Sequence, residues 1–485
     1  MANSLNAELI KHSSFINGKW LTQESDPINV LNPATGAVVC QVASCNESDA
    51  RSAVDAATAA LPAWRAKPAK ERSAILRRWF ELIMHHQKDL GAILSAEQGK
   101  PLAEAEGEVA YGASYIEWFA EEGKRIYGDT IPAANSNSRI VVIKQGVGVV
   151  SAITPWNFPN AMIARKAAPA LAAGCTFIVK AATETPLSAL ALAELATQAG
   201  IPAGVFNVLV SNSSSVVGKV LTQDPRVAKF SFTGSTEVGK ILLAQCATTV
   251  KKTSMELGGN APFIVFDDAD LDEAVKGIMS SKYRNAGQTC VCTNRVYVQS
   301  GVQDALAKKL VDAVSQLKIG AGDEEAVDIG PMINMDAVES VSDLVQDAID
   351  NGAKLLIGGG RHERGELFFQ PTVLSHVVGS MRVAKEEIFG PIAPLISFES
   401  EDEVLAMAND TDVGLAAYMY TRDIGRVWRV SEALEYGMVG INEGIISNEM
   451  APFGGVKQSG MGREGSKYGM DDYLEIKYLC MGGLT

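Results

Sequence analysis

The chain has 485 residues, of which 47% are hydrophobic and 21% charged, and its 43 basic and 57 acidic residues give a formal net charge of −14. A chain of this length exceeds what one hydrophobic core usually supports, so we expect two or three subdomains. The acidic balance argues against a general affinity for nucleic acid or for an anionic membrane surface.

The N-terminal region is predicted to be helical after a short strand and turn at 15–20. Residues 1–11 lack the basic and then apolar regions of a signal peptide, and no apolar run approaches the length of a membrane span, so we expect a cytoplasmic protein. Apolar residues recur at helical spacing over 47–64, 70–97 and 102–127. These helices are interpreted as packing material.

Short β-rich runs alternate with helices from residue 139 onward. This alternation predicts parallel sheets covered by helices on both faces, which bind ligands at the carboxyl ends of their strands. A second alternating region after Glu256 predicts a second α/β domain packed on the first. The expected strands are 140–143, 148–153, 176–179, 205–210, 227–232, 262–266, 295–299, 354–357, 394–398 and 473–478, and the expected helices are 161–173, 187–198, 237–246, 271–280 and 303–317.

Two segments are candidate phosphate-binding loops. The run from Gly234 to Ile241 follows a strand and opens a helix, so backbone amides there can face an anion. It nearly matches a P-loop, but Ile241 stands where Ser or Thr must bind magnesium, which argues against nucleotide triphosphate hydrolysis. The run from Gly146 to Ser151 ends in Ser where a dinucleotide fingerprint has Gly or Ala, and it is interpreted as a β-turn.

Three further segments contain side chains suited to catalysis, and each has a structural alternative. Asn157, between Pro155 and Pro159, can donate an amide hydrogen bond to a ligand or can cap a strand-to-helix turn. Glu256, followed by Leu-Gly-Gly, can act as a base of raised pKa or can end a strand before a turn. Cys290 follows a polar Gly-Gln-Thr run that argues for an accessible loop, although an inert buried thiol is the commoner fate of a lone cysteine.

The sulfur-containing residues indicate a reduced protein without a metal site. The seven cysteines are odd in number and sparse, unlike a disulfide framework. Cys290 and Cys292 lack a second ligand pair at usable spacing, so no metal is expected. The chain has only five histidines and none lies near Cys290 in sequence, which gives a Cys-His protease site little support.

The order of these motifs, more than any one of them, resembles the aldehyde dehydrogenase family, and the resemblance spans nearly the whole chain. The motifs are the Pro-Trp-Asn-Phe-Pro loop at 155–159, Lys180 at a strand end, Gly234-Ser235 at a helix start, Glu256 in Glu-Leu-Gly-Gly, Cys290 in Gly-Gln-Thr-Cys, Glu-Glu-Ile-Phe-Gly-Pro at 386–391 and Pro-Phe-Gly-Gly at 452–455.

The resemblance implies an aldehyde dehydrogenase-like α/β fold with two parallel-sheet domains and a small β oligomerisation element. The dinucleotide-binding domain would comprise residues 1–123 and 146–256, and the catalytic domain residues 257–448. Residues 124–145 and 470–485 would form the oligomerisation element, so a homodimer or homotetramer is expected.

The resemblance also implies a chemistry. Cys290 would attack an aldehyde, a hydride would leave to nicotinamide, and the resulting thioester would be hydrolysed. Glu256 would take the thiol proton and then activate water, since a free cysteine with pKa ~8.5 is mostly protonated at neutral pH. Asn157 and the Cys290 backbone amide would hold the oxyanion, a contribution of roughly 3 kcal/mol per donor. Family members that pass the acyl group to coenzyme A tend to lack this glutamate, so hydrolysis to a carboxylic acid is expected.

The resemblance implies a nicotinamide cofactor and favours NADP, with NAD possible. Members that prefer NAD often have Glu three residues after the strand-end lysine, where it accepts from the ribose 2′-hydroxyl. Thr183 stands there instead and does not repel a 2′-phosphate, with which Lys180 can pair. The residues implied to contact the cofactor are Thr154, Trp156, Lys180, Thr183, Gly234, Ser235, Glu387 and Phe389.

For substrate, the resemblance narrows to the branch that oxidises succinate semialdehyde. Arg165, Arg284 and Ser447 match the contacts of that branch to the substrate carboxylate, and two converging arginines would bind the far carboxylate of a short ω-oxo acid. The alternative is that each arginine pairs with a surface acid. Glutarate semialdehyde is the alternative substrate, because a pocket discriminates one methylene by only ~1–3 kcal/mol. A broader aldehyde dehydrogenase activity stays open, whereas a crystallin-like structural role has no support from the sequence.

Cys292 has no place in this cycle. Its structural alternative is a small residue that lines the pocket. In some members of the resembling branch, however, the paired cysteines form a reversible disulfide that blocks the nucleophile. A bridge between residues two apart is short and easily reduced, so a Cys290–Cys292 switch is expected.

Overall fold

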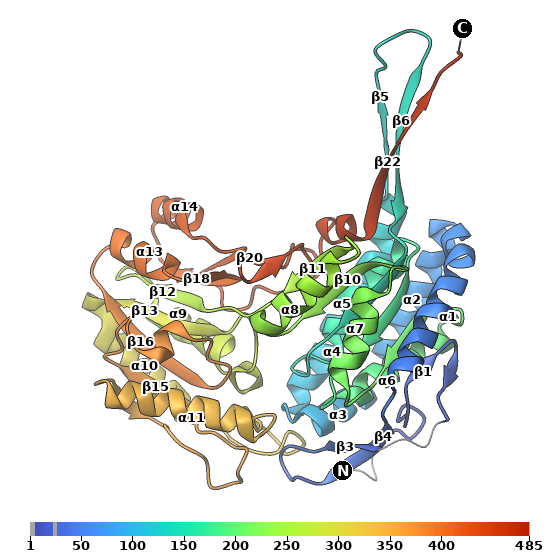
Figure 1. Cartoon of the computed structure of the whole chain (residues 1–485). Coiled ribbons are helices and arrows are strands. Elements are labelled where there is room, and N and C mark those ends of the chain that lie inside the picture. The colour runs from blue at the N-terminus through green and yellow to red at the C-terminus, as the bar shows by residue number, and fades with distance from the viewer. Residues whose placement is uncertain (1–4, 23–26, 485) are drawn as a thin grey trace.

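The computed structural model describes residues 5–22 and 27–484. Residues 1–4, 23–26 and 485 lie outside the described residues. They include the start of the N-terminal segment 1–11, which lacks the features of a signal peptide, and the last residue of the predicted oligomerisation element. Two large sheets lie side by side, and a small three-stranded sheet projects away from them (Figure 1). In the described part of the chain, every helix falls short of the length and apolar character that crossing a bilayer requires.

The first sheet has eight strands and comes mainly from the first half of the chain. Its five central strands run parallel, and antiparallel strands close both edges. Two central strands are buried along their whole length, as expected of a parallel sheet covered on both faces. Across the sheet the strands are β2 (Lys19–Trp20), β1 (Phe15–Ile16), β9 (Phe206–Leu209), β8 (Thr176–Lys180), β7 (Val149–Ile153), β10 (Val227–Thr233), β11 (Lys252–Glu256) and β21 (Gly460–Met461).

Helices cover this sheet in two groups. α1, α5, α6, α7 and α8 contact its strands. α2, α3 and α4 pack mainly on these helices, although the Trp79 ring of α2 lies 5.4 Å from the Phe206 ring of β9. α1 begins at a capping box in which Asn46 and Asp49 satisfy each other's backbone amides. The bounds are α1 (Glu47–Ala66), α2 (Ala69–His85), α3 (Gln87–Gln98), α4 (Leu102–Glu122), α5 (Ala161–Ala172), α6 (Pro186–Gln198), α7 (Ser214–Gln223) and α8 (Thr236–Ala247).

The second sheet has seven strands from the second half of the chain. All its neighbouring strands run parallel except the edge pair β14 and β15. Across the sheet the strands are β14 (Lys354–Ile357), β15 (Thr372–Ser375), β16 (Ile392–Phe398), β13 (Thr293–Gln299), β12 (Ala261–Val265), β18 (Ala416–Tyr420) and β19 (Met438–Ile441). Its helices are α9 (Leu271–Lys282), α10 (Gln303–Val314), α11 (Met335–Asp350), α12 (Arg382–Lys385), α13 (Glu401–Asn409) and α14 (Ile424–Ala433).

The projecting sheet joins distant parts of the chain. β22 (Leu474–Met481) pairs antiparallel with β6 (Arg139–Gly146) along its whole length, and β5 (Asp129–Ile131) pairs with the other edge of β6. After Leu474 every residue of β22 is exposed. The terminal strand predicted at 473–478 is therefore present, and it leaves an apolar strand edge uncovered in the single chain.

Most predicted elements are present, but two predicted helices have the wrong bounds and one hairpin is absent from the predictions. The predicted helix 70–97 is two helices, because the chain turns at His86, whose ring bonds Asp89 Oδ2 at 3.0 Å in the first turn of α3. The helix predicted over 102–127 ends at Glu122. The hairpin of β3 (Pro27–Leu31) and β4 (Val38–Ala43) was not predicted.

The polar segment 457–467 contributes to two short strands. It begins at the end of β20 (Val456–Lys457), which pairs with β17 (Val413–Gly414), and contains β21, which pairs with β11 so that Gly460 lies opposite Glu256. A Cβ at Gly460 would lie 1.8 Å from the Met255 carbonyl oxygen, so only glycine fits this close approach. The segment thereby closes the edge of the first sheet beside Glu256.

Candidate active site

Cys290 lies where two cavities meet, because it lines both of them. The first, of about 310 Å³, we call the arginine pocket, since Arg165 and Arg284 line it together with Ser447. The second, of about 240 Å³, we call the Gly-Ser pocket. Its lining includes Trp156, Gly234, Ser235, Glu256, Glu387 and Phe389 beside Asn157 and Cys290. The residues predicted for substrate and most of those predicted for cofactor thus fall on opposite sides of one thiol.

The loop that presents Cys290 is not the accessible loop that its polar sequence suggests. Gln288 and Thr289 are buried. The Gln288 amide nitrogen donates to Asn285 O at 3.1 Å and Pro331 O at 3.4 Å, and its oxygen accepts from Ile333 N at 3.0 Å. A polar side chain was needed here because the buried loop backbone requires hydrogen-bond partners.

The same loop has an unusual backbone. Asn285, Ala286 and Gly287 have φ values of 52°, 53° and 75°, three successive left-handed residues. A Cβ at Gly287 would lie 2.1 Å from the Gly390 carbonyl oxygen, which excludes any other residue there. Left-handed non-glycine residues cost free energy and persist only where their surroundings hold them, as at many functional sites.

Asn157 points toward this loop. Its Nδ2 donates to Gln288 O at 3.0 Å, which leaves its second amide hydrogen for a ligand beside Cys290. The capping alternative is wrong, because Asn160 occupies the N-cap of α5 and makes no side-chain cap bond. Asn157 follows β7 of the first sheet and Cys290 precedes β13 of the second sheet, and both side chains line the Gly-Ser pocket.

Glu256 ends β11 and faces the same pocket as the thiol. Burial, and secondly the negative charge of Glu464, raise the pKa of Glu256 well above its ordinary value, whereas Arg165 and Lys166 lower it. Its Oε2 has no hydrogen-bond partner among the described residues. Burial also raises the pKa of the Cys290 thiol to about 12, so the resting group is a neutral thiol that needs a proton acceptor.

The two arginines of the arginine pocket differ in their partners. Arg165 is buried, forms a 2.6 Å ion pair with Glu464 and donates to the Tyr111 hydroxyl at 3.3 Å. The alternative of a surface partner is wrong for Arg165, because Glu464 is itself buried and also pairs with Lys166 at 2.5 Å. Arg284 has no ion pair among the described residues and lies 5.6 Å from the centre of the Phe158 ring. Its charge is available to a ligand.

The Gly-Ser pocket opens at a strand-to-helix junction. β10 ends at Thr233, and Ser235 caps α8, its hydroxyl accepting from Val238 N at 3.4 Å. Trp156 and Phe389 meet edge to face with ring centres 5.7 Å apart. Glu387 accepts from Gly259 N at 3.1 Å.

Three predicted cofactor residues do not line the Gly-Ser pocket. Thr154 N donates to Lys180 O at 3.2 Å, which joins the carboxyl ends of β7 and β8. Lys180 Nζ donates to Thr183 Oγ1 at 3.4 Å, and that hydroxyl donates to Ser211 O at 3.0 Å. The lysine and the threonine therefore contact each other.

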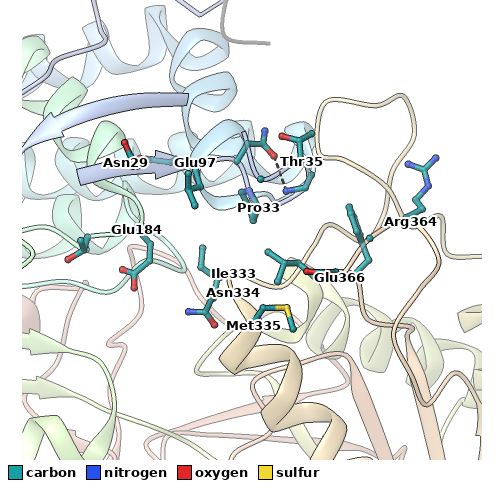
Figure 2. A pocket seen from close by; sticks show the side chains of 18 of the residues that line it. Asn29, Pro33, Thr35, Glu97, Glu184, Ile333, Asn334, Met335, Arg364 and Glu366 are labelled. Atoms are coloured by element: carbon teal, nitrogen blue, oxygen red, sulfur yellow. Dashed lines mark hydrogen bonds between the residues drawn. The ribbon is translucent and has the colours of Figure 1, made fainter. Parts of the chain in front are cut away.

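Figure 2 shows a third cavity, of about 700 Å³, between the loop that joins β3 to β4 and the segments around 333–335 and 364–368. None of the predicted catalytic residues lines it, and Thr183 is the one predicted site residue that does. Glu97 points into the same region, but its carboxylate accepts from Leu187 N and Ser188 N at 2.7 and 2.8 Å and so caps α6. The predicted catalytic residues line the two smaller cavities.

Cys292 lines neither the arginine pocket nor the Gly-Ser pocket, so the pocket-lining alternative is wrong. It is buried, and its thiol donates weakly to Lys282 O at 3.4 Å. Burial raises the pKa of Cys292, and the neighbouring Lys282 lowers it. Lys282 is itself fully buried, and its Nζ has no hydrogen-bond partner among the described residues.

Sequence reasoning missed several residues of the site. Tyr111, Glu108 and Lys100 line the arginine pocket, and Glu464 pairs with Arg165. One signal was present in the sequence: Glu104, Glu108 and Tyr111 recur at helical spacing on one face of a predicted helix. Nothing local marks Glu464, which lies far along the chain from its partners.

Cys290 lies between a polar pocket at a helix N-terminus and a pocket with two arginines, beside the buried carboxylate of Glu256. This arrangement is typical of oxidoreductases that combine a bound cofactor with a covalent nucleophile. The sequence profile of the aldehyde dehydrogenase family matches residues 20–479, and the chain belongs to this family. Its members are enzymes that oxidise aldehydes with NAD(P).

Individual relatives are similar over their whole length. The chain is 61% identical to the succinate-semialdehyde dehydrogenase [NADP(+)] GabD of Escherichia coli (strain K12), covering 98% of this chain and 99% of the relative. It is also 61% identical to a glutarate-semialdehyde dehydrogenase of Pseudomonas putida, covering 98% of each. A crystal structure described as an E. coli NADP-dependent enzyme superposes with a TM-score of 0.97 at 60% identity, over 98% of this chain and 99% of that one.

Proposed function

We propose that this protein oxidises succinate semialdehyde to succinate with NADP. The observation that supports this most is that Arg165, Arg284 and Cys290 line one pocket of about 310 Å³. A four-carbon ω-oxo acid has a carboxylate for the arginines and an aldehyde for the thiol. The name of the similar E. coli relative agrees with this substrate and this cofactor, and the name of the matching crystal structure agrees with the cofactor.

In the proposed cycle, the substrate carboxylate binds Arg284, and Arg165 shares its charge between the ligand and Glu464. Glu256 accepts the Cys290 proton as the sulfur bonds to the aldehyde carbon. Asn157 Nδ2 and the Cys290 backbone amide donate to the resulting oxyanion, each contributing roughly 3 kcal/mol. Glu256 releases the thiol proton to solvent before deacylation and then takes a proton from the water that attacks the thioester. It returns that proton to the sulfur as succinate leaves, so that Cys290 is again a thiol.

The Gly-Ser pocket fits a dinucleotide. The capped N-terminus of α8 offers backbone amides to a pyrophosphate, and Glu387 has a carboxylate for a ribose hydroxyl. A nicotinamide bound there would supply the hydride acceptor for the oxidation. Trp156, Gly234, Ser235, Glu387 and Phe389 would hold it on the Cys290 side, and Thr154, Lys180 and Thr183 would lie near the adenosine ribose.

Thr183→Glu is expected to lower kcat/KM for NADP by about tenfold or more, because a carboxylate beside the 2′-phosphate repels it. Selectivity should shift toward NAD. The matched control is Thr183→Gln, which has the same size without the charge and should retain the NADP preference. Steady-state kinetics with both cofactors measure this, and equal or better specificity constants with NAD in the parent protein would refute the NADP assignment.

Arg165→Ala and Arg284→Ala are each expected to lower kcat/KM for succinate semialdehyde about 10- to 100-fold, the usual effect of losing hydrogen bonds to a charged group. Butanal, which lacks the carboxylate, should lose much less. Arg77→Ala, an exposed arginine of α2 that lines neither cavity, is the control. An unchanged preference for succinate semialdehyde over butanal in both variants would refute the proposed substrate.

Glutarate semialdehyde is the second candidate, because the similar P. putida relative is named for it. The additional methylene changes binding by only ~1–3 kcal/mol, so one pocket can accept both acids. The ratio of kcat/KM for the two semialdehydes decides which is preferred.

We further propose that Cys290 and Cys292 form a reversible disulfide that blocks the nucleophile. The two thiols are two residues apart, and Lys282 beside Cys292 offsets part of the rise that burial causes in the pKa of Cys292. Peroxide would oxidise one thiol to a sulfenic acid, and the other thiolate would displace water from it. Cys292→Ala should then lose the dithiothreitol-reversible part of peroxide inactivation. If the variant and the parent were equally sensitive and equally restored, the switch would be absent.

We also propose the domain division at 1–123 with 146–256, at 257–448, and at 124–145 with 470–485 as the oligomerisation element. The exposed apolar side chains of β22, Ile476 and Tyr478, support pairing with a second copy into a homodimer or homotetramer. Light scattering of the full chain measures the mass of the assembly.

A further inference from the structure

A buried ion pair lines one side of the arginine pocket. Lys100, between α3 and α4, and Glu108, in the second turn of α4, are each only 1% exposed, and Lys100 Nζ lies 2.6 Å from Glu108 Oε2. Taking two charges out of water is costly, and a buried pair is at best weakly stabilising in itself. The partners of these two side chains therefore suggest what the pair does.

Both members hold the segment that contains Asn157. Lys100 Nζ donates to the Asn157 backbone carbonyl at 2.8 Å and lies 4.0 Å from the centre of the Phe158 ring. The second Glu108 oxygen accepts from Asn160 N at 3.0 Å and Ala161 N at 3.2 Å. The pair thus fixes the segment at both of its ends.

The same helix also holds the loop that presents Cys290. Glu104, one turn before Glu108, accepts from Asn285 N at 2.9 Å. Asn285 Nδ2 then donates to the Asn157 and Gln288 carbonyls, both at 3.2 Å. The Asn157 carbonyl therefore receives one hydrogen bond from the α4 side and one from the Cys290 loop. One face of α4 sets the separation between the two loops.

We propose that Lys100 and Glu108 are positioning residues that hold the Asn157 amide where it meets the oxyanion formed at Cys290. This inference rests on the proposed role of Asn157. The pair acts through the loop backbone, since each hydrogen bond of Lys100 Nζ and of the Glu108 carboxylate goes either to the other member of the pair or to residues 157–161. It does not require contact with substrate.

Lys100→Met keeps the length of the side chain and removes its donors. We expect kcat to fall by roughly 10²-fold, the usual effect of displacing a catalytic group by about 1 Å. The loss should be the same factor for succinate semialdehyde and for butanal. Alkylation of Cys290 by iodoacetamide, a displacement that forms no oxyanion, should keep its rate. Lys100→Arg, which keeps a donor and the charge, should recover part of kcat.

A double-mutant cycle with Asn157→Ala gives the decisive readout. If Lys100 acts through the Asn157 amide, Lys100→Met costs nothing further once that amide is gone. Additive losses would overturn the proposal. A loss confined to succinate semialdehyde would also overturn it, because it would indicate direct contact with the substrate carboxylate. A parallel fall in alkylation rate would overturn it as well, because it would indicate a distorted nucleophile loop.

Glu108→Gln serves if Lys100→Met does not fold, because it keeps the shape and one acceptor but removes the charge. The same pattern of a kcat loss without a change in alkylation rate is expected, and its absence overturns the proposal. The cycle can be run with any aldehyde that the parent protein oxidises. A failure of the succinate semialdehyde assignment would therefore appear in the parent protein alone and would be distinguished from a failure of this inference.

Discussion

Cys290→Ala is expected to lower kcat/KM for aldehyde oxidation by at least ~10⁴-fold, because every later step of the proposed cycle takes place on the Cys290 sulfur. Cofactor binding should be close to that of the parent, since the contacts of the Gly-Ser pocket come from other residues. Steady-state kinetics and fluorescence titration with NADPH measure the two effects separately.

Cys292→Ala is the matched control for this loss. It removes a thiol two residues away that lines neither cavity, so it should retain most of the activity under reducing conditions. Substantial oxidation by Cys290→Ala would mean that the aldehyde reacts without a covalent thiol intermediate, and the proposed mechanism would be wrong.

Glu256→Gln is expected to reduce kcat by about 10²- to 10⁴-fold, the usual contribution of a general base. The thiol of Cys290, with its pKa raised to about 12, cannot ionise alone at neutral pH, and glutamine cannot accept its proton. Acylation and thioester hydrolysis should both slow. Rapid-quench kinetics with intact-protein mass spectrometry follow the thioester on Cys290, and an unchanged kcat would exclude Glu256 as the base.

The pH dependence tests the same residue. Only the carboxylate form of Glu256 is a base, and its pKa is raised, so activity should rise with pH above the ordinary carboxyl range. Glu464→Gln removes a negative neighbour and leaves Arg165 and Lys166 unpaired, both of which lower the pKa of Glu256. The acid limb should therefore move to lower pH. Arg165→Ala removes a positive neighbour and should move it to higher pH.

The sequence predicts best those site residues that lie at the end of a strand. Lys180 ends β8 and Glu256 ends β11, and Gly234 follows β10 as the helix-start motif suggests. These positions follow from local periodicity, because parallel strands bring their carboxyl ends to one edge. The order of the strands across each sheet is a property of the whole chain that local patterns do not contain.

The remainder depends on long-range contacts. Glu464 reaches Lys166 across 298 residues, and Lys100 reaches Asn157 across 57. Gln288 was interpreted as exposed because polar residues usually are, but a buried loop backbone needs polar partners. The sequence pattern does not indicate the break at His86, because the helical spacing of apolar residues continues through it. Such features appear only when the backbone traces of both halves are known.

The central claim is that an ω-carboxylate and an aldehyde are bound at once between the arginines and Cys290, with NADP beyond the thiol. Its most direct test is kcat/KM of the parent protein for succinate semialdehyde, glutarate semialdehyde and butanal, each with NADP and with NAD. We predict the highest value for succinate semialdehyde with NADP and by far the lowest values for butanal. Butanal oxidised as efficiently as the two semialdehydes would contradict the claim.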